Sequence, residues 1–233
     1  MKKSEIATNL AAIKKELKSA QLIAVTKYSP IEDVILAYEA HQYDFGENRV
    51  ADLKEKAEYF KKAELTKVRW HFIGHLQSNK VRELLKVPNL YAIHSIDSIS
   101  LLEELIKREN DFQGKELKLF FQVKTSNEIE KSGFLNAEDL KMAFDLLRKQ
   151  KGSKYKLIGL MTMGSIRTSD FEQEASRCFR DLNSIARTME ETYHLKEKLK
   201  LSMGMTQDFK LALAAGSDFI RVGSAIFKSH SVS

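Results

Sequence analysis

The stretch LIAVTKYSPIEDVILAYEA, residues 22–40, contains an apolar run, a lysine and a helix start in close succession. Residues 22–25 are apolar and partly β-branched and are followed by serine and proline, which is typical of a buried strand that ends in a turn. Residues 29–32, SPIE, match a capping box with proline at the first helical position, so a helix is predicted from there to about residue 40. Lys27 then lies at the C-terminal tip of the strand, where an ammonium group must be solvated, paired or used in chemistry.

The same order of strand and helix recurs along the chain. Helix-like segments separate eight strand candidates, which lie at residues 22–25, 43–49, 68–76, 90–97, 118–125, 156–163, 200–205 and 218–227. Strands that alternate with helices pair in parallel through right-handed crossovers. The predicted fold class is therefore α/β, a (β/α)8 TIM barrel that forms a single domain over residues 1–233.

An extra helix is predicted before the first strand, because Ile6, Leu10, Ile13 and Leu17 recur at steps of three and four. The last helix of the barrel is expected to be short or missing. Capping boxes at residues 100–103 and 169–172 predict the starts of two more helices. The alternative fold is an open doubly wound sheet, but its phosphate-binding fingerprint GxGxxG does not occur in the sequence.

Composition restricts the class of protein. The formal net charge of +6 comes from 38 basic and 32 acidic residues, and the lysines alternate with glutamates in helix-like segments, as on solvated helix faces. Nucleic-acid binding is therefore not expected. No apolar run approaches the length of a membrane span, and the N-terminus lacks the apolar region of a secretion signal. With Cys178 as the only cysteine, the sequence favours a cytoplasmic protein, and we expect a monomer because the barrel accounts for every apolar stripe.

Polar residues are concentrated at the predicted strand tips, and in a barrel of this type the active face is where the strands end. The last two tips are the most informative, because TIM barrels often bind a phosphate group with the loops after strands seven and eight. Here those loops contain residues 202–204, SMG, together with Gly223 and Ser224. Their small side chains would let the backbone approach an anion closely.

A lysine at the first strand tip and a phosphate site at the last two suggest an aldehyde-bearing phosphate held as a Schiff base. A primary amine condenses with a carbonyl group, which is why lysine is the residue for this chemistry. Arg221 would then serve as a hydrogen-bond donor to a cofactor ring nitrogen or to the phosphate. Lys124 is a second strand-tip lysine, so the residues alone leave open a Schiff-base aldolase built on that side chain.

His71 and His75 have the spacing of an HxxxH metal pair, but they lie in a predicted strand. Four residues along a strand span about 13 Å, which is too far for two ligands to share one ion. No metal site is expected.

Eight ordered motifs across nearly the whole chain resemble the pyridoxal phosphate homeostasis protein family: IAVTKY, FGENRV, WHFIGHLQSNK, SIDS, EKSGF, GLMTM, LSMGMTQDF and AAGSDFIRVGSAIF. The barrel of that family is similar to the N-terminal barrel of alanine racemase. The resemblance implies that Lys27 holds pyridoxal 5'-phosphate (PLP) covalently. It further implies that Arg221 faces the pyridine nitrogen, that Ser202, Gly223 and Ser224 surround the phosphate, and that Asn48, His75 and Met163 lie near the ring.

Two hypotheses follow for the activity. An arginine only donates hydrogen bonds, so at the pyridine nitrogen it would disfavour ring protonation and weaken carbanion chemistry. Racemisation also needs two bases on opposite faces of the substrate α-carbon, and Lys27 would supply one of them. We therefore expect a PLP carrier or regulator without dedicated amino-acid turnover, with PLP-dependent apoenzymes as recipients. The alternative is a PLP-dependent enzyme such as an amino-acid racemase.

Overall fold

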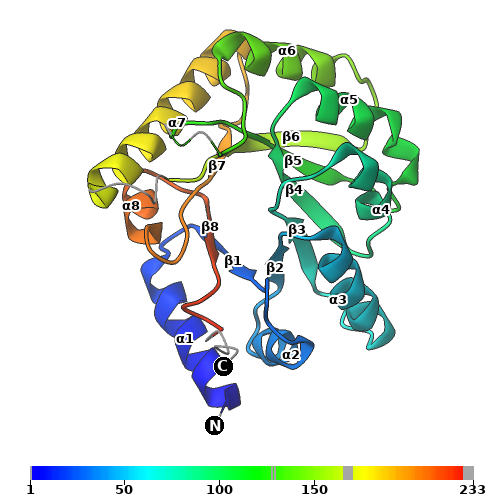
Figure 1. The fold of residues 1–233 in the computed structure, drawn as a ribbon, viewed down its shortest axis with the longest axis vertical. Coiled ribbons are helices and arrows are strands. Elements are labelled where there is room, and N and C mark those ends of the chain that lie inside the picture. Colours follow the sequence, from blue (N-terminus) through cyan, green and yellow to red (C-terminus); the bar gives the residue numbers. More distant parts are fainter. Residues whose placement is uncertain (1, 127, 129, 165–169, 228–233) are drawn as a thin grey trace.

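Eight parallel strands form a closed barrel in the computed structural model, which describes residues 2–126, 128, 130–164 and 170–227 (Figure 1). The strands follow one another around the barrel in chain order, and β8 pairs with β1. This closure confirms the predicted (β/α)8 barrel and excludes the open doubly wound sheet. The strands are β1 Gln21–Val25, β2 Asp44–Glu47, β3 Arg69–Phe72, β4 Leu90–Ile96, β5 Leu117–Gln122, β6 Tyr155–Met161, β7 Lys200–Ser202 and β8 Phe219–Val222.

Helices surround the strands and connect each one to the next (Figure 1). They are α2 Ile31–Glu39, α3 Val50–Lys62, α4 Val81–Leu85, α5 Ile99–Lys107, α6 Ala137–Arg148, α7 Phe171–Tyr193 and α8 Phe209–Ala214, with short 3₁₀ turns at Ser78–Lys80 and Glu109–Asp111. Within the described ranges, every helix is too short or too polar to span a bilayer.

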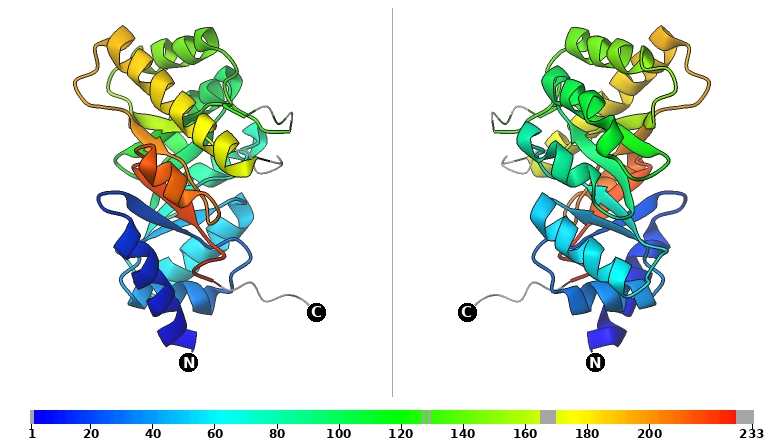
Figure 2. Two further views of the ribbon diagram at one scale, coloured as in Figure 1. Left: turned by 90° about the vertical axis from the view of Figure 1, so that its left-hand side faces the viewer. Right: turned by 90° about the vertical axis from the view of Figure 1, so that its right-hand side faces the viewer.

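The extra N-terminal helix, α1 Lys2–Glu16, completes the outer ring. It packs beside α2, as Figure 2 shows at one end of the molecule, and its Glu16 pairs with Lys210 of α8 at 3.5 Å. The side-chain amide of Asn9 donates to the carbonyl of Ile226, beyond β8, at 3.1 Å. The apolar stripe predicted from the sequence is buried, which confirms this helix. The last helix, predicted to be short or missing, would follow β8 and lies outside the described residues.

Two apolar clusters fill the protein. The larger lies between the strands and the helices and includes the rings of Phe45, Phe60 and Trp70, which contact one another in edge-to-face and tilted arrangements. The smaller lies inside the barrel and contains Ile23, Ala92, Phe120, Met161 and Phe219. Because side chains alternate along a strand, every second residue faces this interior. At the C-terminal end of each strand, the next residues in this alternation therefore also point toward the barrel axis.

The helix caps differ from those predicted. Pro30 is itself the N-cap residue of α2, with an extended ψ of 156° and no side-chain hydrogen bond, so Ser29 is not the start of a capping box. At α5 the hydroxyl of Ser98, not that of Ser100, accepts the hydrogen bond from the Leu101 N–H. Helix α7 is capped by Asp170, and the predicted cap at position 169 lies outside the described residues. Each helix nevertheless follows its strand as expected.

Candidate functional site

A cavity of about 700 Å³ opens where the strands end. Its lining includes residues from the tips of β1, β2, β3, β6 and β8, which is the face predicted from the sequence. Seven of the eight candidate residues line it: Lys27, Asn48, His75, Met163, Arg221, Gly223 and Ser224. Ser202 is not among them, because it is fully buried below the cavity.

The pairing of β1 with β8 brings the two ends of the chain together at this site. In that ladder Ile23 is the partner of Arg221, and Ala24 is the partner of Val222. A Cβ atom on Gly223 would lie only 3.0 Å from the carbonyl oxygen of Val25, so glycine lets the two backbones approach closely here. Lys27 and the loop after β8 therefore share one wall.

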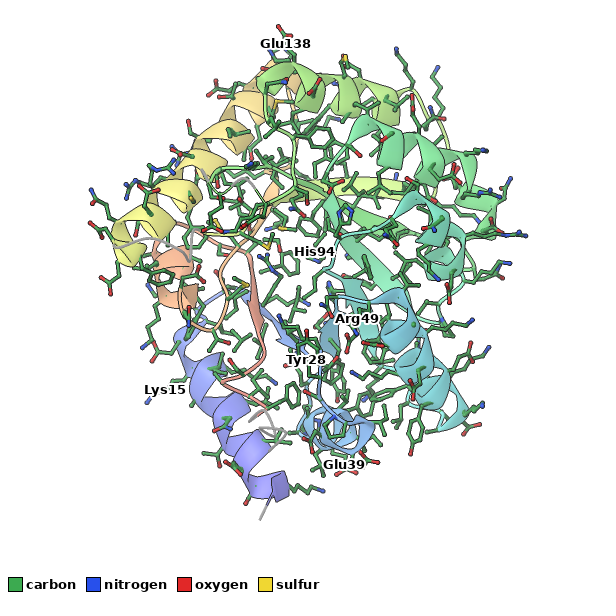
Figure 3. All side chains as sticks on the ribbon, viewed as in Figure 1. Lys15, Tyr28, Glu39, Arg49, His94 and Glu138 are labelled. Carbon is green, nitrogen blue, oxygen red and sulfur yellow. The ribbon has the colours of Figure 1, made fainter. Side chains whose placement is uncertain are left out.

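Lys27 is exposed to the cavity and makes no hydrogen bond or ion pair with any other described residue. The next residue, Tyr28, adopts a left-handed conformation with φ of 65° and exposes 78% of its side chain at the cavity mouth (Figure 3). Lys124 is not among the residues that line this cavity; it lies beside it with Thr125 and Thr162. Of the two strand-tip lysines, Lys27 is the one placed in the main cavity.

Residues 202–204 were expected to contribute to the site after β7, but the residues that line the cavity there begin at Met205. Ser202 and Met203 are buried, and Gly204 turns the chain with φ of +95°. The hydroxyl of Ser224 lies 3.3 Å from that of Thr206 and joins the two loops. Among the described residues, no acceptor pairs with the backbone N–H of either residue. Two N–H groups and two hydroxyls without a protein acceptor outside the pair are the kind of donors that suit an anion. Thr206 was not among the residues predicted from the sequence.

Two buried acceptor oxygens also line the cavity. Asn48 Oδ1 and Asp208 Oδ2 have no hydrogen-bond partner within the described part of the chain. A buried polar atom without a partner costs free energy, so each oxygen suits a donor supplied by a ligand. The cavity is thus equipped to hold a polar molecule.

Arg221 is anchored from below on both terminal nitrogens. Nη1 donates to the Ser202 hydroxyl at 2.8 Å and Nη2 donates to the Thr162 carbonyl at 2.9 Å. Burial lowers the pKa of Arg221 to about 10, and the charge of Asp208 partly offsets that effect, so the guanidinium keeps its charge at neutral pH. Burial in turn raises the pKa of Asp208, although the Met205 N–H and Arg221 both favour its charged form.

A buried ion pair supports the tip of β1. The Glu47 carboxylate is fully buried, accepts a hydrogen bond from the Thr26 hydroxyl at 2.7 Å and pairs with the ammonium group of Lys56 from α3. Lys56 also donates to the Thr26 carbonyl at 2.8 Å. Glu47 lies within the strand predicted over residues 43–49, whereas Lys56 has the sequence pattern of a solvent-facing lysine on a helix. Together they fix the residue that precedes Lys27.

The two histidines of the HxxxH pattern occupy different environments. His71 is fully buried inside the barrel, while His75 is exposed at the cavity and lies 3.2 Å from a carboxylate oxygen of Asp97. No group of three or more metal-ligating side chains occurs among the described residues. His71 contacts His94, whose pKa burial holds well below its usual value, and burial also lowers the pKa of His71.

Comparison with known proteins gives a consistent picture. The chain is 37% identical to the mouse pyridoxal phosphate homeostasis protein over 213 residues, which cover 89% of this chain and 76% of the mouse protein. It superposes on the structure of PipY from Synechococcus elongatus with PLP bound with a TM-score of 0.82 and 33% identity, covering 95% of this chain and 99% of PipY. Alanine racemase from Corynebacterium glutamicum shares the fold, with a TM-score of 0.72 and 13% identity over 99% of this chain and 62% of the racemase. No protein-family model matches this chain.

The buried ion pair should dominate the stability of the β1 tip. Lys56→Met removes the cation and leaves the Glu47 carboxylate buried without a counter-charge, so we expect the free energy of unfolding to fall by about 3 kcal/mol in urea titrations. Lys54→Met is the matched control, because Lys54 lies on the same helix in an exposed pair with Glu83 and should contribute less than about 1 kcal/mol. Equal losses in the two variants would contradict the description of Glu47 and Lys56.

Acid should destabilise the fold through the two buried histidines. In the unfolded chain both rings take up a proton below about pH 6.5, whereas His71 and His94 stay neutral when folded. The unfolded state then binds more protons, so the free energy of unfolding falls as the pH drops from about 7.5 to about 5.5. We expect His94→Leu to reduce that fall by about 1 kcal/mol in urea titrations at the two pH values.

The control for this prediction is His194→Asn, which replaces an exposed histidine in a left-handed conformation that asparagine tolerates. It should leave the pH dependence unchanged. If wild type and His94→Leu lost the same free energy in acid, His94 would have to be protonated in the folded protein, and its described burial would be in error.

Proposed function

Because this chain belongs to the pyridoxal phosphate homeostasis protein family, we propose that it binds PLP covalently through Lys27 as a Schiff base and takes part in intracellular PLP homeostasis. The observation that carries the proposal is the cavity itself. A lysine amine, a buried arginine and the hydroxyl and N–H donors of two loops all border one space. PLP, when bound, supplies an aldehyde that condenses with a primary amine and a ring that can withdraw electrons.

The residues present fit the groups of PLP. Lys27 provides the amine, and the loops that contain Thr206 and Ser224 provide unpaired N–H groups and hydroxyls for a phosphate. Arg221 provides donors for the ring nitrogen. Asn48 offers an acceptor oxygen without a partner among the described residues, and His75 and Met163 border the remaining space. Ser202, which the family resemblance implies at the phosphate, is buried and accepts a hydrogen bond from the Arg221 side chain, so we propose that it supports the site through Arg221.

Arg221 favours carriage of PLP over turnover of amino acids. Its guanidinium only donates hydrogen bonds and stays charged at neutral pH, so it stabilises an unprotonated ring nitrogen. A strong electron sink would need an acidic residue at that position. We therefore propose a carrier or regulator that hands PLP to apoenzymes, acting as a cytoplasmic monomer.

The covalent site can be tested by visible absorption spectroscopy with and without added PLP. We expect a yellow band in the wild type that Lys27→Ala abolishes. Lys131 also lines the cavity, but its ammonium group donates to the Gly164 carbonyl at 2.6 Å and pairs with Glu128 at 3.0 Å, so it should not replace Lys27. Lys124→Ala is the matched control and should keep the band, since Lys124 does not line the cavity. Borohydride reduction followed by peptide mass spectrometry should place the added pyridoxyl group on Lys27.

A band that persists in Lys27→Ala would remove Lys27 from the proposal, and a colourless wild type would remove PLP. The racemase alternative is tested separately by α-proton exchange of amino acids in deuterated water. The proposal expects exchange no faster than with free PLP, whereas a racemase would accelerate it.

The phosphate group should be recognised by the loops after β7 and β8. We expect the double variant Thr206→Val/Ser224→Ala to raise the Kd of PLP at least tenfold, roughly the factor for one lost hydrogen bond to a charged group. The Kd of pyridoxal, which lacks the phosphate, should change little. Thr192→Val, on an exposed part of α7, is the control. Equal effects on both ligands would place the phosphate elsewhere.

A further inference from the structure

A continuous row of hydrogen-bonding groups crosses the barrel interior beneath the cavity. Asp44 Oδ1 lies 3.0 Å from His71 Nε2, and His71 Nδ1 lies 2.9 Å from His94 Nε2. His94 Nδ1 lies 2.8 Å from the Ser202 hydroxyl, which also receives the 2.8 Å hydrogen bond from Arg221. The five residues come from β2, β3, β4, β7 and β8, and all are buried. We call this row the Asp44–Arg221 chain.

The chemistry of its two ends fixes the direction of every hydrogen bond. Arg221 can only donate, so the Ser202 oxygen accepts from it. Among the described residues, the only acceptor beside the Ser202 hydroxyl is His94 Nδ1, so the hydroxyl proton is donated there. His94 then carries its proton on Nε2 and donates to His71 Nδ1. His71 in turn carries its proton on Nε2 and donates to the Asp44 carboxylate, which can only accept.

This arrangement disfavours an additional proton on either ring, because that proton would break or reverse a hydrogen bond of the chain. A second proton on His71 would set its Nδ1–H against the Nε2–H of His94. A second proton on His94 would turn the Ser202 hydroxyl away from Nδ1, its only acceptor among the described residues. The environment agrees, because burial lowers the pKa of both histidines and His94 stacks on the Phe120 ring at 4.1 Å. Figure 3 shows His94 in the middle of the molecule, far from the peripheral Lys15 and Glu138.

Asp44 is held as an acceptor at the other end. Burial alone would raise its pKa, but the hydrogen bonds from His71 and Arg69 outweigh burial and keep the pKa below its usual value. Arg69 Nη2 donates to the second carboxylate oxygen at 2.5 Å. An ionised carboxylate therefore terminates the chain.

We propose that His94 is a positioning residue for Arg221: by accepting the Ser202 proton, it locks the Ser202 oxygen as an acceptor and so fixes the guanidinium beneath the cavity. With Nη1 held by Ser202 and Nη2 by the Thr162 carbonyl, Arg221 cannot rotate, and its remaining N–H groups are available to a ligand ring. The effect on PLP rests on the proposed function. The hydrogen-bond direction and the fixed guanidinium do not.

The direction can be measured without any ligand. Long-range proton–nitrogen NMR spectra of the ¹⁵N-histidine-labelled wild type should show His71 and His94 as neutral rings protonated on Nε2. A ring protonated on Nδ1, or an imidazolium at neutral pH, would overturn the proposal. This readout needs no variant, so it decides the matter even if substitutions unfold the protein.

The positioning effect requires a matched pair of variants. His94→Asn and His94→Leu have similar size, but the Asn side-chain oxygen can replace Nδ1 as the acceptor for Ser202, whereas Leu accepts nothing. In the PLP-free protein, the Nη–H signals of Arg221 should stay separate and exchange slowly in wild type and His94→Asn. They should merge or exchange faster in His94→Leu. Identical spectra in the two variants would mean that His94 acts only by packing.

Binding of PLP provides the second readout of the same pair. We expect the Kd to rise about tenfold in His94→Leu, as for one lost hydrogen bond to a charged group, and clearly less in His94→Asn. If wild type bound no PLP while the NMR results held, the proposed function would fail and the positioning role would stand. If PLP bound the wild type but both variants bound equally well, the positioning role would fail and the proposed function would stand.

Discussion

The pairing of β1 with β8 is the interaction on which the site depends. Lys27 and Ser224 are separated by most of the sequence, and they border one cavity only because the first and last strands share a ladder of four residue pairs. The close approach of Gly223 to the Val25 carbonyl belongs to the same seam. Parallel strands place all their carboxyl ends on one face, so the closed barrel brings the residues at the strand tips together on that face. The candidate site therefore depends on the closure of the barrel as much as on any single side chain.

Buried polar groups are the second organising feature, and the structure satisfies them in two separate networks. The Glu47–Lys56 pair lies on the outer side of β2 and holds the backbone of Thr26, while the Asp44–Arg221 chain runs through the interior. Each network ends beside a residue that faces the cavity, Lys27 in one case and Arg221 in the other. A buried charge is costly unless it is paired and hydrogen-bonded. These networks accordingly restrict where the lysine and the guanidinium can lie, because any displacement would leave a charge unsatisfied.

Much of this could be predicted from the sequence, because a period of two and a short apolar run identify a strand and its tip directly. Lys27, Arg221 and Gly223 follow such runs and lie where expected. Thr206 was missed because the alternating pattern of residues 200–205, KLSMGM, does not reveal that the strand stops at Ser202 and that Gly204 turns the chain. Lys56 was missed because a lysine among other lysines on an amphipathic helix has the pattern of a solvated residue. The contact of His94 with Ser202 joins residues 108 positions apart, and only the strand register of the whole barrel determines it.

The place of α1 in the outer ring has a consequence for the order of folding. Its apolar stripe and one edge of β1 are made first, but their partners near α8 and β8 come from the last part of the described chain. Bringing together segments so far apart in the sequence costs conformational entropy before any contact between them has formed. Such contacts therefore form slowly. During synthesis on the ribosome, β1 therefore remains without its β8 partner until residues 219–222 have been made. The seam that creates the cavity is thus expected to be among the last parts of the barrel to form.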